Sequence, residues 1–439
     1  MPASLQTRYR EWRWRRAAAK KIRALTNVLQ SMAGRPPHSP RFYFVDPAYE
    51  PAVGHYACVA RALAAECAAR GWPFIHLTGP FDQTPADNRI PLFHDHGRLA
   101  LRFLHSEPEF SNQSQVRAST RTVRGHFTWE LGAVLDLDRD LFSTGESYFF
   151  FYTGDILHPW SQLRRAPLGP RQHLAVFQFS LPSNFQLPSV QTRFARHTRL
   201  LARVLETSKD SSARFRLCTD SPALRRLLTP VLGRQLAEIQ PPLLASSDLA
   251  SLPAPADLAN RPHPCGYFGY LTPKHGWPIV LQYLREHAGQ KTRWLLALNL
   301  KRGEPALLDV ARQTASSAGA ELHVGFWTEV QYSAALASCS CLLLPYTAAP
   351  YTLISSGKLI DALRHACLPV VPVGTWLAEV VQQLGYGLVV AEGDWPGVPA
   401  RLANLDLPSL WAQRQARVRD FLSSFTARTC LDTLVRASE

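Results

Sequence analysis

The sequence contains no apolar stretch long enough to cross a membrane. Its longest apolar runs, such as Trp294–Leu298 and Cys341–Pro345, have the length of a β-strand, whereas a transmembrane helix needs about 18 apolar residues in succession. The first residues are cationic, but no apolar segment follows them that could serve as the core of a secretory signal. The sequence therefore predicts a cytoplasmic protein.

None of the eight cysteines forms a C-x2-C pair, which is the spacing typical of metal sites. Cys339 and Cys341 are two residues apart in an apolar segment, so in a β-strand they would lie on one face and pack in a core. Thiols of a protein without a secretory signal are expected to remain reduced. The sequence thus predicts neither disulfides nor a bound metal.

Acidic residues are nearly absent from residues 1–40, where nine Lys and Arg residues accompany a single acid, Glu11. This segment supplies much of the net charge of +14, and such a basic arm favours contact with an anionic surface. Apolar residues recur in it at steps of three and four, which predicts an amphipathic helix that ends near Gly34 and Pro36. The apolar residues are Leu5, Tyr9, Trp12, Ile22, Leu25, Leu29 and Met32.

Two interpretations of this helix remain open. Its basic and apolar faces would suit the headgroup layer of an anionic membrane, with residues 5–33 attaching the protein to the inner membrane face. Alternatively, the apolar stripe packs on the rest of the protein and the charges are solvated. Nucleic acid is not expected as a partner, because no basic stripe recurs elsewhere in the chain.

The composition is that of a globular protein. With 46% hydrophobic and 19% charged residues the chain is not disordered, and 24 Gly and 34 Pro residues exclude a collagen-like protein. The length of 439 residues fits two domains of about 200 residues each. Residues 241–263 are rich in Pro, Ala and Ser, which predicts a linker between the two domains.

Strand-like and helix-like segments alternate on both sides of this linker. Before it, the strand Arg41–Asp46 is followed by the helix Tyr56–Arg70. After it, the alternation is regular, as in the strand Glu321–Val324 and the helix Glu329–Ala337. Repeated strand–helix units of this length predict a parallel, doubly wound sheet.

We therefore predict an α/β protein with two Rossmann-like domains that face a cleft. The expected segments are a basic helical arm (1–40), a first Rossmann-like domain (41–240), the linker (241–263), a second Rossmann-like domain (264–405) and a C-terminal segment (406–439).

Four segments of the second half resemble a known protein family. They are GYFGYLTPKHGW (266–277), HVGFWTEVQYSAALASCSCLLLPY (323–346), SSGKLIDALRHACLPVVPVGTWLAEVV (355–381) and GYGLVVAEGD (385–394). In this order they resemble the second domain of GT-B glycosyltransferases, and most of all the retaining glycosyltransferase family 4. In the first half, PAVGHYACVARALAAECAARG (51–71) is similar to the loop and first helix of that family's acceptor domain.

The resemblance implies an enzyme that moves a sugar from a nucleotide-sugar donor to a glycan or lipid-linked acceptor with retention of configuration. The donor is the substrate, and no further cofactor is implied. The resemblance also implies that residues 41–240 form the acceptor domain and residues 264–405 the nucleotide-sugar domain, and that a C-terminal helix around Leu410–Thr426 crosses back onto the first domain. Two alternatives remain: a degenerate member of the family that binds ligands or acts as a scaffold, and a nucleotide-sugar epimerase.

Ser355, Ser356 and Gly357 precede a helix that is predicted to begin near Lys358. The free N–H groups and the positive dipole end of a helix start suit a diphosphate, and glycine lets the backbone approach a ligand closely. The ordinary alternative is a serine that caps the helix. The strand–helix context favours phosphate binding.

Asp361 lies one turn into that helix. It matches the second acid of the family's paired-glutamate motif, which by resemblance accepts hydrogen bonds from the ribose of the nucleotide. A carboxylate suits neighbouring hydroxyls because it offers several lone pairs. The first glutamate of the motif, however, falls on Leu353.

The family's basic pair, which neutralises the diphosphate, falls on Tyr270 and His275. Lys274 is one position away and Lys358 is a second candidate for the missing positive charge. A diphosphate leaving group needs cations or hydrogen-bond donors as the bond to the sugar breaks. Lys274 and His275 are therefore candidate catalytic residues.

In the first domain, Gly54 and His55 occupy a strand-to-helix turn that faces the predicted cleft, and Asp155 and His158 follow an aromatic strand. The first two could bind donor phosphate or acceptor, although a plain turn explains them equally well. A retaining enzyme of this type needs no strong side-chain base, because the leaving phosphate can take the proton of the acceptor. His158 is thus expected to position the reacting sugar, with Asp155 beside it.

Overall fold

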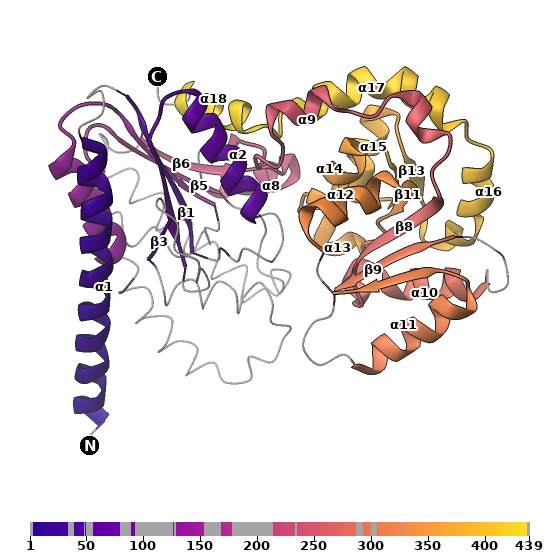
Figure 1. The fold of residues 1–439 in the computed structure, drawn as a ribbon, viewed down its shortest axis with the longest axis horizontal. Helices are drawn as coiled ribbons and strands as arrows, with labels where there is room; N and C mark the ends of the chain where they lie inside the picture. Colours follow the sequence, from indigo (N-terminus) through magenta and orange to yellow (C-terminus); the bar gives the residue numbers. More distant parts are fainter. Residues whose placement is uncertain are drawn as a thin grey trace. The chain divides into compact units, whose positions relative to one another are not determined.

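The computed structural model describes most of the chain as two compact units, each of which is described by itself (Figure 1). The first unit comprises Met1–Ile239 and Cys430–Glu439, and the second comprises Gln240–Thr429. The described residues are 3–33, 39–47, 49, 56–79, 89–92, 126, 129–152, 168–177, 214–232, 235–286, 293–299, 305–325 and 327–436.

In the described part of the first unit, seven strands form one sheet in the order β3-β2-β1-β4-β5-β6-β7, and every neighbouring pair is parallel. The strands are β1 (Arg41–Asp46), β2 (Phe74–Thr78), β3 (Arg89–Pro91), β4 (Ser147–Phe151), β5 (Gln172–Phe177), β6 (Phe215–Thr219) and β7 (Ala237–Glu238). The strand order reverses between β1 and β4, and in such sheets ligands bind beyond the carboxyl ends of the strands at this reversal.

Helices pack on this sheet. They are α1 (Ala3–Ala33), α2 (Tyr56–Ala69), the helical residues 129–141, α8 (Pro222–Leu232) and the part of α18 (Ala427–Arg436) that begins at Cys430. β1 is buried along its whole length. Tyr43 and Val45 join a core cluster with α1, whereas Phe42 and Phe44 pack against aromatic rings of β2 and β4. The strand is therefore apolar on both faces, as buried parallel strands are.

A buried ionic network closes the amino ends of three strands. The Asp138 carboxylate accepts hydrogen bonds from Arg41 Nε (3.3 Å), Ser147 Oγ (2.9 Å), Tyr43 OH (2.6 Å) and Gln172 Nε2 (2.9 Å). Every one of these partners is buried with Asp138, so the hydrogen-bonding capacity of this buried acid is used within the core. The network ties the helix that contains Asp138 to β1, β4 and β5, which gives this edge of the sheet a structural role.

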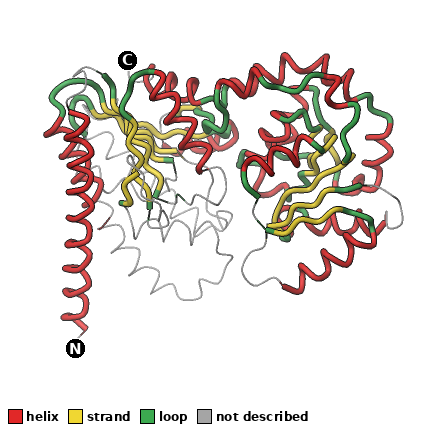
Figure 2. The backbone as a smooth tube through the Cα atoms, viewed as in Figure 1, coloured by secondary structure: helices red, strands yellow, loops and turns green. Residues whose placement is uncertain are grey.

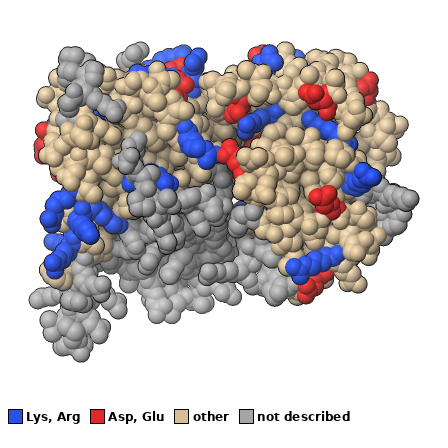
Figure 3. Space-filling model, viewed as in Figure 1, with Lys and Arg blue, Asp and Glu red and all other residues tan. Residues whose placement is uncertain are grey.

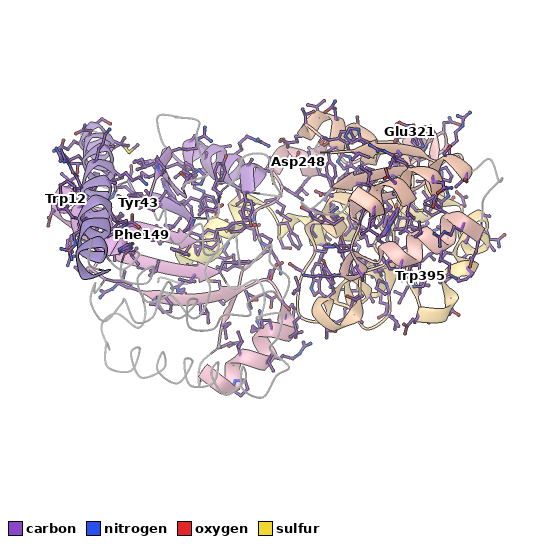
Figure 4. The ribbon with its side chains drawn as sticks, turned by 90° about the horizontal axis from the view of Figure 1, so that it is seen from below. Trp12, Tyr43, Phe149, Asp248, Glu321 and Trp395 are labelled. Atoms are coloured by element: carbon purple, nitrogen blue, oxygen red, sulfur yellow. The ribbon has the colours of Figure 1, made fainter. Side chains whose placement is uncertain are left out.

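The second half of α1 belongs to the core of the first unit. Leu25 and Leu29 are fully buried in the core cluster, and Ile22 and Met32 pack against it. Trp12 is 53% exposed and lies on the side of α1 away from Tyr43 (Figure 4). The single apolar stripe predicted from the sequence is therefore wrong, since at 3.6 residues per turn Trp12 is about 140° from Leu25 around the helix.

In the described part of the second unit, six strands form one sheet in the order β10-β9-β8-β11-β12-β13, again with every pair parallel (Figure 2). The strands are β8 (His263–Tyr270), β9 (Leu295–Asn299), β10 (Glu321–Val324), β11 (Cys339–Leu343), β12 (Leu368–Pro372) and β13 (Leu388–Val390). The order reverses between β8 and β11. Two parallel sheets with helices between their strands confirm the predicted α/β fold class.

Helices surround this second sheet (Figure 1). The α-helices are α9 (Ser246–Ala250), α10 (Trp277–Glu286), α11 (Pro305–Ser317), α12 (Glu329–Ala337), α13 (Ala348–Tyr351), α14 (Gly357–Arg364), α15 (Trp376–Leu384), α16 (Val398–Ala403) and α17 (Leu407–Ser423). Three 3-10 turns are η1 (Pro255–Leu258), η2 (Pro273–His275) and η3 (Glu392–Gly397). In the described ranges of both units, no helix combines the length and the apolar composition that a bilayer crossing requires.

Residues 241–263 form part of the second unit, whereas the sequence predicts a linker there. α9 and η1 lie within this segment and pack against α17. Trp411 Nε1 donates a hydrogen bond to Pro253 O at 2.8 Å, and Arg364 Nη2 pairs with Asp248 Oδ1 at 2.7 Å. The proline-rich composition reflects short helical turns held by side chains of α14 and α17, because Pro255 begins η1 at a position that needs no backbone N–H.

The chain leaves the second unit beside the place where it begins. Leu244 N donates a hydrogen bond to Phe425 O at 3.1 Å. The return to the first unit starts at Cys430, so the helix expected around Leu410–Thr426 is α17 of the second unit. Beyond that point, Asp432 pairs with Arg70 of α2 at 2.8 Å.

All eight cysteines are free in the structure. Cys265 and Cys341 lie side by side on the paired strands β8 and β11, with their sulfur atoms 3.0 Å apart. Burial raises the pKa of the Cys367 thiol to about 12. Cys265, Cys341 and Cys367 are all buried, so these thiols form part of the packed core of the second unit.

Candidate functional site

Two loops meet where the strand order of the second sheet reverses. Gly276, which ends η2 after β8, has φ +75°, and a Cβ atom there would lie 1.8 Å from Pro345 O, beyond the end of β11. Thr347 N donates a hydrogen bond to Lys274 O at 3.2 Å, which joins the same two loops. Only glycine permits this approach. The loops after β8 and β11 are therefore held together, and they form one wall of the candidate site at the switch point.

Aromatic rings line this wall. The ring centroids of Tyr270 and His275 are 5.3 Å apart, those of His275 and Tyr346 are 5.8 Å apart, and Tyr346 stacks on Tyr351 at 4.3 Å. His275 Nδ1 is 2.6 Å from Thr272 Oγ1, so the imidazole is held in place. Tyr270 and His275 thus pack as neighbouring rings.

Lys274 also contributes to this wall. Its Nζ atom lies 5.8 Å from the centre of the Tyr351 ring, within the range of a cation–π contact. The contact places a positive charge beside the switch point. Among the described residues, Lys274 is one of two lysines at this edge of the second sheet, with Lys358.

The start of α14 faces the same edge. The helix begins at Gly357, one residue before the predicted start, and Ser356 is its extended N-cap residue with φ −134° and ψ 114°. The side chain of Ser356 makes no capping hydrogen bond in the described structure. It shares a hydrogen bond with Tyr346 instead. The ordinary explanation of Ser356 as a helix cap therefore does not hold, and Ser355 directly precedes it.

Lys358 is the second cation at this edge. Its Nζ donates a hydrogen bond to Phe268 O on β8. Burial lowers the pKa of Lys358 from 10.5 to about 8, and the negative charge of Asp361 partly opposes that shift. A cation in the first turn of a helix lies at the positive end of the helix dipole. An anion bound here would therefore relieve an unfavourable arrangement of charge.

Asp361 is held by a residue that the sequence analysis missed. Tyr332 OH, on α12, donates a hydrogen bond to Asp361 Oδ2 at 3.0 Å. Burial, followed by the charge of Asp361 and the hydrogen bond to it, raises the pKa of the Tyr332 phenol well above its ordinary value. No sequence pattern signals this contact, because the two residues belong to different helices and meet only through packing.

A further group of rings stands beside this pair. Trp327 lies between Phe268, at 5.5 Å, and His323, at 4.4 Å, measured between ring centroids. Within the described structure, His323 Nε2 is buried and has no hydrogen-bond partner. Flat apolar surfaces of this kind, next to an acid and a lysine, suit a ligand that has an aromatic part and an anionic part.

The predicted residues of the first unit, Gly54, His55, Asp155 and His158, lie outside the described residues. At the carboxyl edge of the first sheet the structure instead places two buried acids, Asp46 at the end of β1 and Asp220 after β6. Burial, and then nearby charged and polar groups that include both acids, raises the pKa of Tyr152 well above its ordinary value. In the described part of the chain, no three metal-ligating side chains gather.

No family model matches the chain, and no curated protein matches its sequence. Solved structures do match its fold. The N-terminal domain of trehalose-6-phosphate phosphatase from Candida albicans is 12% identical, with 92% of this chain and 98% of that chain covered and a TM-score of 0.61. Sucrose-phosphate synthase from Thermosynechococcus elongatus is 15% identical, with 91% of this chain and 98% of that chain covered and a TM-score of 0.58. Anabaena HepE in complex with UDP-glucose is 15% identical, with 91% of this chain and 99% of that chain covered and a TM-score of 0.54.

At these identities the similarity shows a shared fold alone. Neighbours of this kind are glycosyltransferases of the GT-B type, so the predicted GT-B architecture is confirmed at the level of the fold. Membership of glycosyltransferase family 4 stays a prediction.

Proposed function

We propose that the protein is a retaining glycosyltransferase that takes its sugar from a nucleoside-diphosphate sugar. The observation that carries this proposal is the start of α14 at the switch point of the second sheet. There an uncapped helix start, the partly buried Lys358 and the carboxylate of Asp361 lie within one helical turn. HepE, which has the same fold, was solved with UDP-glucose bound.

In the proposed donor site, different residues contact the diphosphate, the ribose and the leaving group of the nucleotide sugar. Backbone N–H groups around Ser355, Ser356 and Gly357 bind the diphosphate, with the ammonium of Lys358 beside them. Asp361 accepts a hydrogen bond from the ribose. Lys274 stabilises the negative charge that develops on the leaving group, and His275, whose ring is held by Thr272, fixes the shape of the wall next to it.

The reaction needs no side-chain base. The bond between the anomeric carbon and the phosphate oxygen breaks, and the acceptor oxygen bonds to the same face of that carbon. The acceptor's proton moves to the departing phosphate. In this scheme His158 and Asp155 position the sugar, and Gly54 and His55 contact the acceptor side. The wall of the site supports the leaving group mainly by holding its phosphates in one place.

A ligand-binding protein without transferase activity is the second candidate. It is favoured by one observation, namely that Tyr270 and His275 pack as rings where the family carries cations. Calorimetric titration with UDP, GDP and ADP, followed by assays of sugar release from the matching sugar nucleotides, separates the two candidates. Binding with sugar release supports the transferase, binding without it supports the second candidate, and no binding contradicts both.

The outward face of α1 supports an anionic membrane as a partner, which would place the enzyme near a glycan or lipid-linked acceptor. Arg16, Lys20 and Arg23 are exposed and lie opposite Leu25 on the helix, on the same side as Trp12. Figure 3 shows a group of Lys and Arg residues along the described part of α1. Cations beside an exposed tryptophan match the charged headgroup layer.

Vesicle sedimentation tests this partner. Removing residues 1–34 would also remove Leu25 and Leu29 from the core, so substitutions are the better probe. Exchanging Arg16, Lys20 and Arg23 for Ala should abolish binding to phosphatidylglycerol vesicles at low salt. Exchanging Arg401, Arg417 and Arg419, which are also exposed, removes the same charge from the second unit and should leave binding intact. Equal loss in both triple variants would contradict a role for α1.

A further inference from the structure

Asp361 belongs to a small cluster that joins three elements of the second unit. Tyr332 on α12 donates to Asp361 Oδ2, and the rings of Tyr332 and Phe268 meet edge to face at 5.8 Å. The carbonyl of Phe268 in turn accepts the hydrogen bond of Lys358. Lys358 and Asp361 of α14 are thus both held against β8, Lys358 through the backbone carbonyl of Phe268 and Asp361 through Tyr332.

We propose that Tyr332 is a positioning residue that turns the Asp361 carboxylate so that one oxygen, Oδ1, receives the ribose hydroxyls. This inference rests on the proposed function. Within the described structure, Oδ1 of Asp361 accepts no hydrogen bond, whereas Oδ2 is taken by the tyrosine. A carboxylate held at one oxygen cannot rotate freely, so the other oxygen keeps a fixed direction.

The chemistry of Tyr332 suits this task. A buried phenol next to a carboxylate keeps its proton, so it remains a donor to Asp361 over the whole range of neutral pH. It therefore never competes with the ribose as an acceptor. Asp361 offers one oxygen to the ligand instead of two, and the direction of that oxygen decides whether a pair of ribose hydroxyls is recognised.

The proposal is tested by comparing ribose with a sugar that has no hydroxyls at these positions. Calorimetry gives the dissociation constants of UDP and of 2′,3′-dideoxy-UDP, and the same pair is measured for GDP and ADP. Loss of a hydrogen bond to a charged acceptor predicts that the full-length parent prefers the ribose form roughly ten- to a hundredfold. In Tyr332→Phe we expect this preference to fall several-fold, while the affinity for the dideoxy form changes little.

Tyr386→Phe is the matched control. Tyr386 OH donates to Ala366 O at 2.7 Å in the same unit, so this variant also loses one tyrosine hydrogen bond. It should keep the parent's preference for ribose. If Tyr332 acts only through Asp361, Tyr332→Phe should have no further effect on the preference in an Asp361→Ala background.

Three results would count against the proposal, and they are distinguishable. An unchanged preference in Tyr332→Phe overturns the role of Tyr332 and leaves nucleotide binding intact. An equal fall in Tyr332→Phe and Tyr386→Phe shows a general loss of structure and also overturns it. No binding of any of the three nucleotides by the folded parent overturns the proposed function, and the inference with it.

Discussion

In the second unit, α12 and α15 are among the helices whose first turn is capped by a side chain, whereas the first turn of α14 is not. α12 begins with a capping box, in which Thr328 Oγ1 accepts from Gln331 N and Gln331 Oε1 accepts from Thr328 N. In α15, Thr375 Oγ1 accepts from Ala378 N at 3.2 Å. At α14, Ser356 provides no such bond, and a lysine follows within the first turn.

This difference identifies a helix start whose backbone amide groups are not satisfied by a side-chain cap. Capping satisfies amide groups that a helix start would otherwise leave unpaired. α14 lacks this contribution and places Lys358 where the helix dipole disfavours a cation. The helix remains in place because its apolar residues, among them Leu359 and Leu363, are fully buried. Packing secures α14, and its first turn is therefore available for a ligand.

The largest expected effect is a loss of nucleotide affinity when Asp361, in the uncapped helix α14, is substituted. Asp361→Ala removes a charged acceptor and should weaken binding of the nucleoside diphosphate roughly ten- to a hundredfold. Asp361→Asn should cost less, because one acceptor oxygen remains. Leu353→Ala is the control and should barely alter binding, since no charge is lost there. Equal affinity in Asp361→Ala and the parent, measured by calorimetry, would remove Asp361 from the site.

Lys358→Met should lower the affinity for the nucleoside diphosphate about tenfold, because a charged contact to phosphate is lost. The free protein should keep its stability or gain some, since a partly buried ammonium is costly to desolvate. Lys274→Met identifies which lysine supplies the charge. If it weakens binding while Lys358→Met does not, the phosphates lie nearer to Tyr351 than to α14.

The pH dependence of nucleotide affinity is a second test of the role of Lys358. The pKa of Lys358 is about 8, so at lower pH the ammonium is already protonated and binds an anion without taking up a proton. Above this pH the affinity should fall, and binding should be accompanied by proton uptake. Titrations at pH 8.5 in two buffers of different ionisation enthalpy measure this uptake, which should disappear in Lys358→Met.

The same lysine links folding to pH in the opposite direction. Its folded pKa lies below the ordinary value of 10.5. Between about pH 8 and 10.5 the unfolded chain therefore binds more protons than the folded one, and this group makes the free protein more stable as pH rises. Denaturant unfolding of the parent and of Lys358→Met across this window should show the difference.

The smallest effect tests the caps themselves. Thr375→Ala should destabilise the protein by about 1 kcal/mol, the usual cost of a lost N-cap. Ser356→Ala should cost less in stability, because its side chain caps nothing, and it should change nucleotide binding little, because the proposed phosphate ligands there are backbone N–H groups. Chemical denaturation and calorimetry on both variants decide between these expectations. A stability loss in Ser356→Ala that matches the loss in Thr375→Ala would make α14 an ordinary capped helix.

The sequence predicts elements well where local signals agree. β10 and α12 have the predicted bounds, and Thr328 caps α12, because alternation, capping and apolar spacing all point to the same structure. At the site, the sequence also leads to Ser356, Lys358 and Asp361, since they follow a strand and open a helix. Their role as ligands of a nucleotide stays a prediction.

Contacts between distant elements were not predictable. Tyr332 meets Asp361 only because α12 packs on β11 and α14 packs on the neighbouring strand β12, and no spacing in the sequence encodes that. The spacing of apolar residues in α1 suggests one stripe, but tertiary packing selects Leu25 and Leu29 and leaves Trp12 outside. In residues 241–263, composition alone predicts a linker, while the contacts of Asp248 and Pro253 with later helices make the segment part of a unit.

The return of the chain at Cys430 has a consequence for biosynthesis. Cys430 and Leu431 are buried in the first unit, so its core is complete only after the whole second unit has been translated. The second unit is contiguous, and its two ends meet at the hydrogen bond between Leu244 and Phe425. Nascent chains that stop at residue 429 should thus resist protease in the second unit while the first remains sensitive, which reverses the usual order of folding on the ribosome.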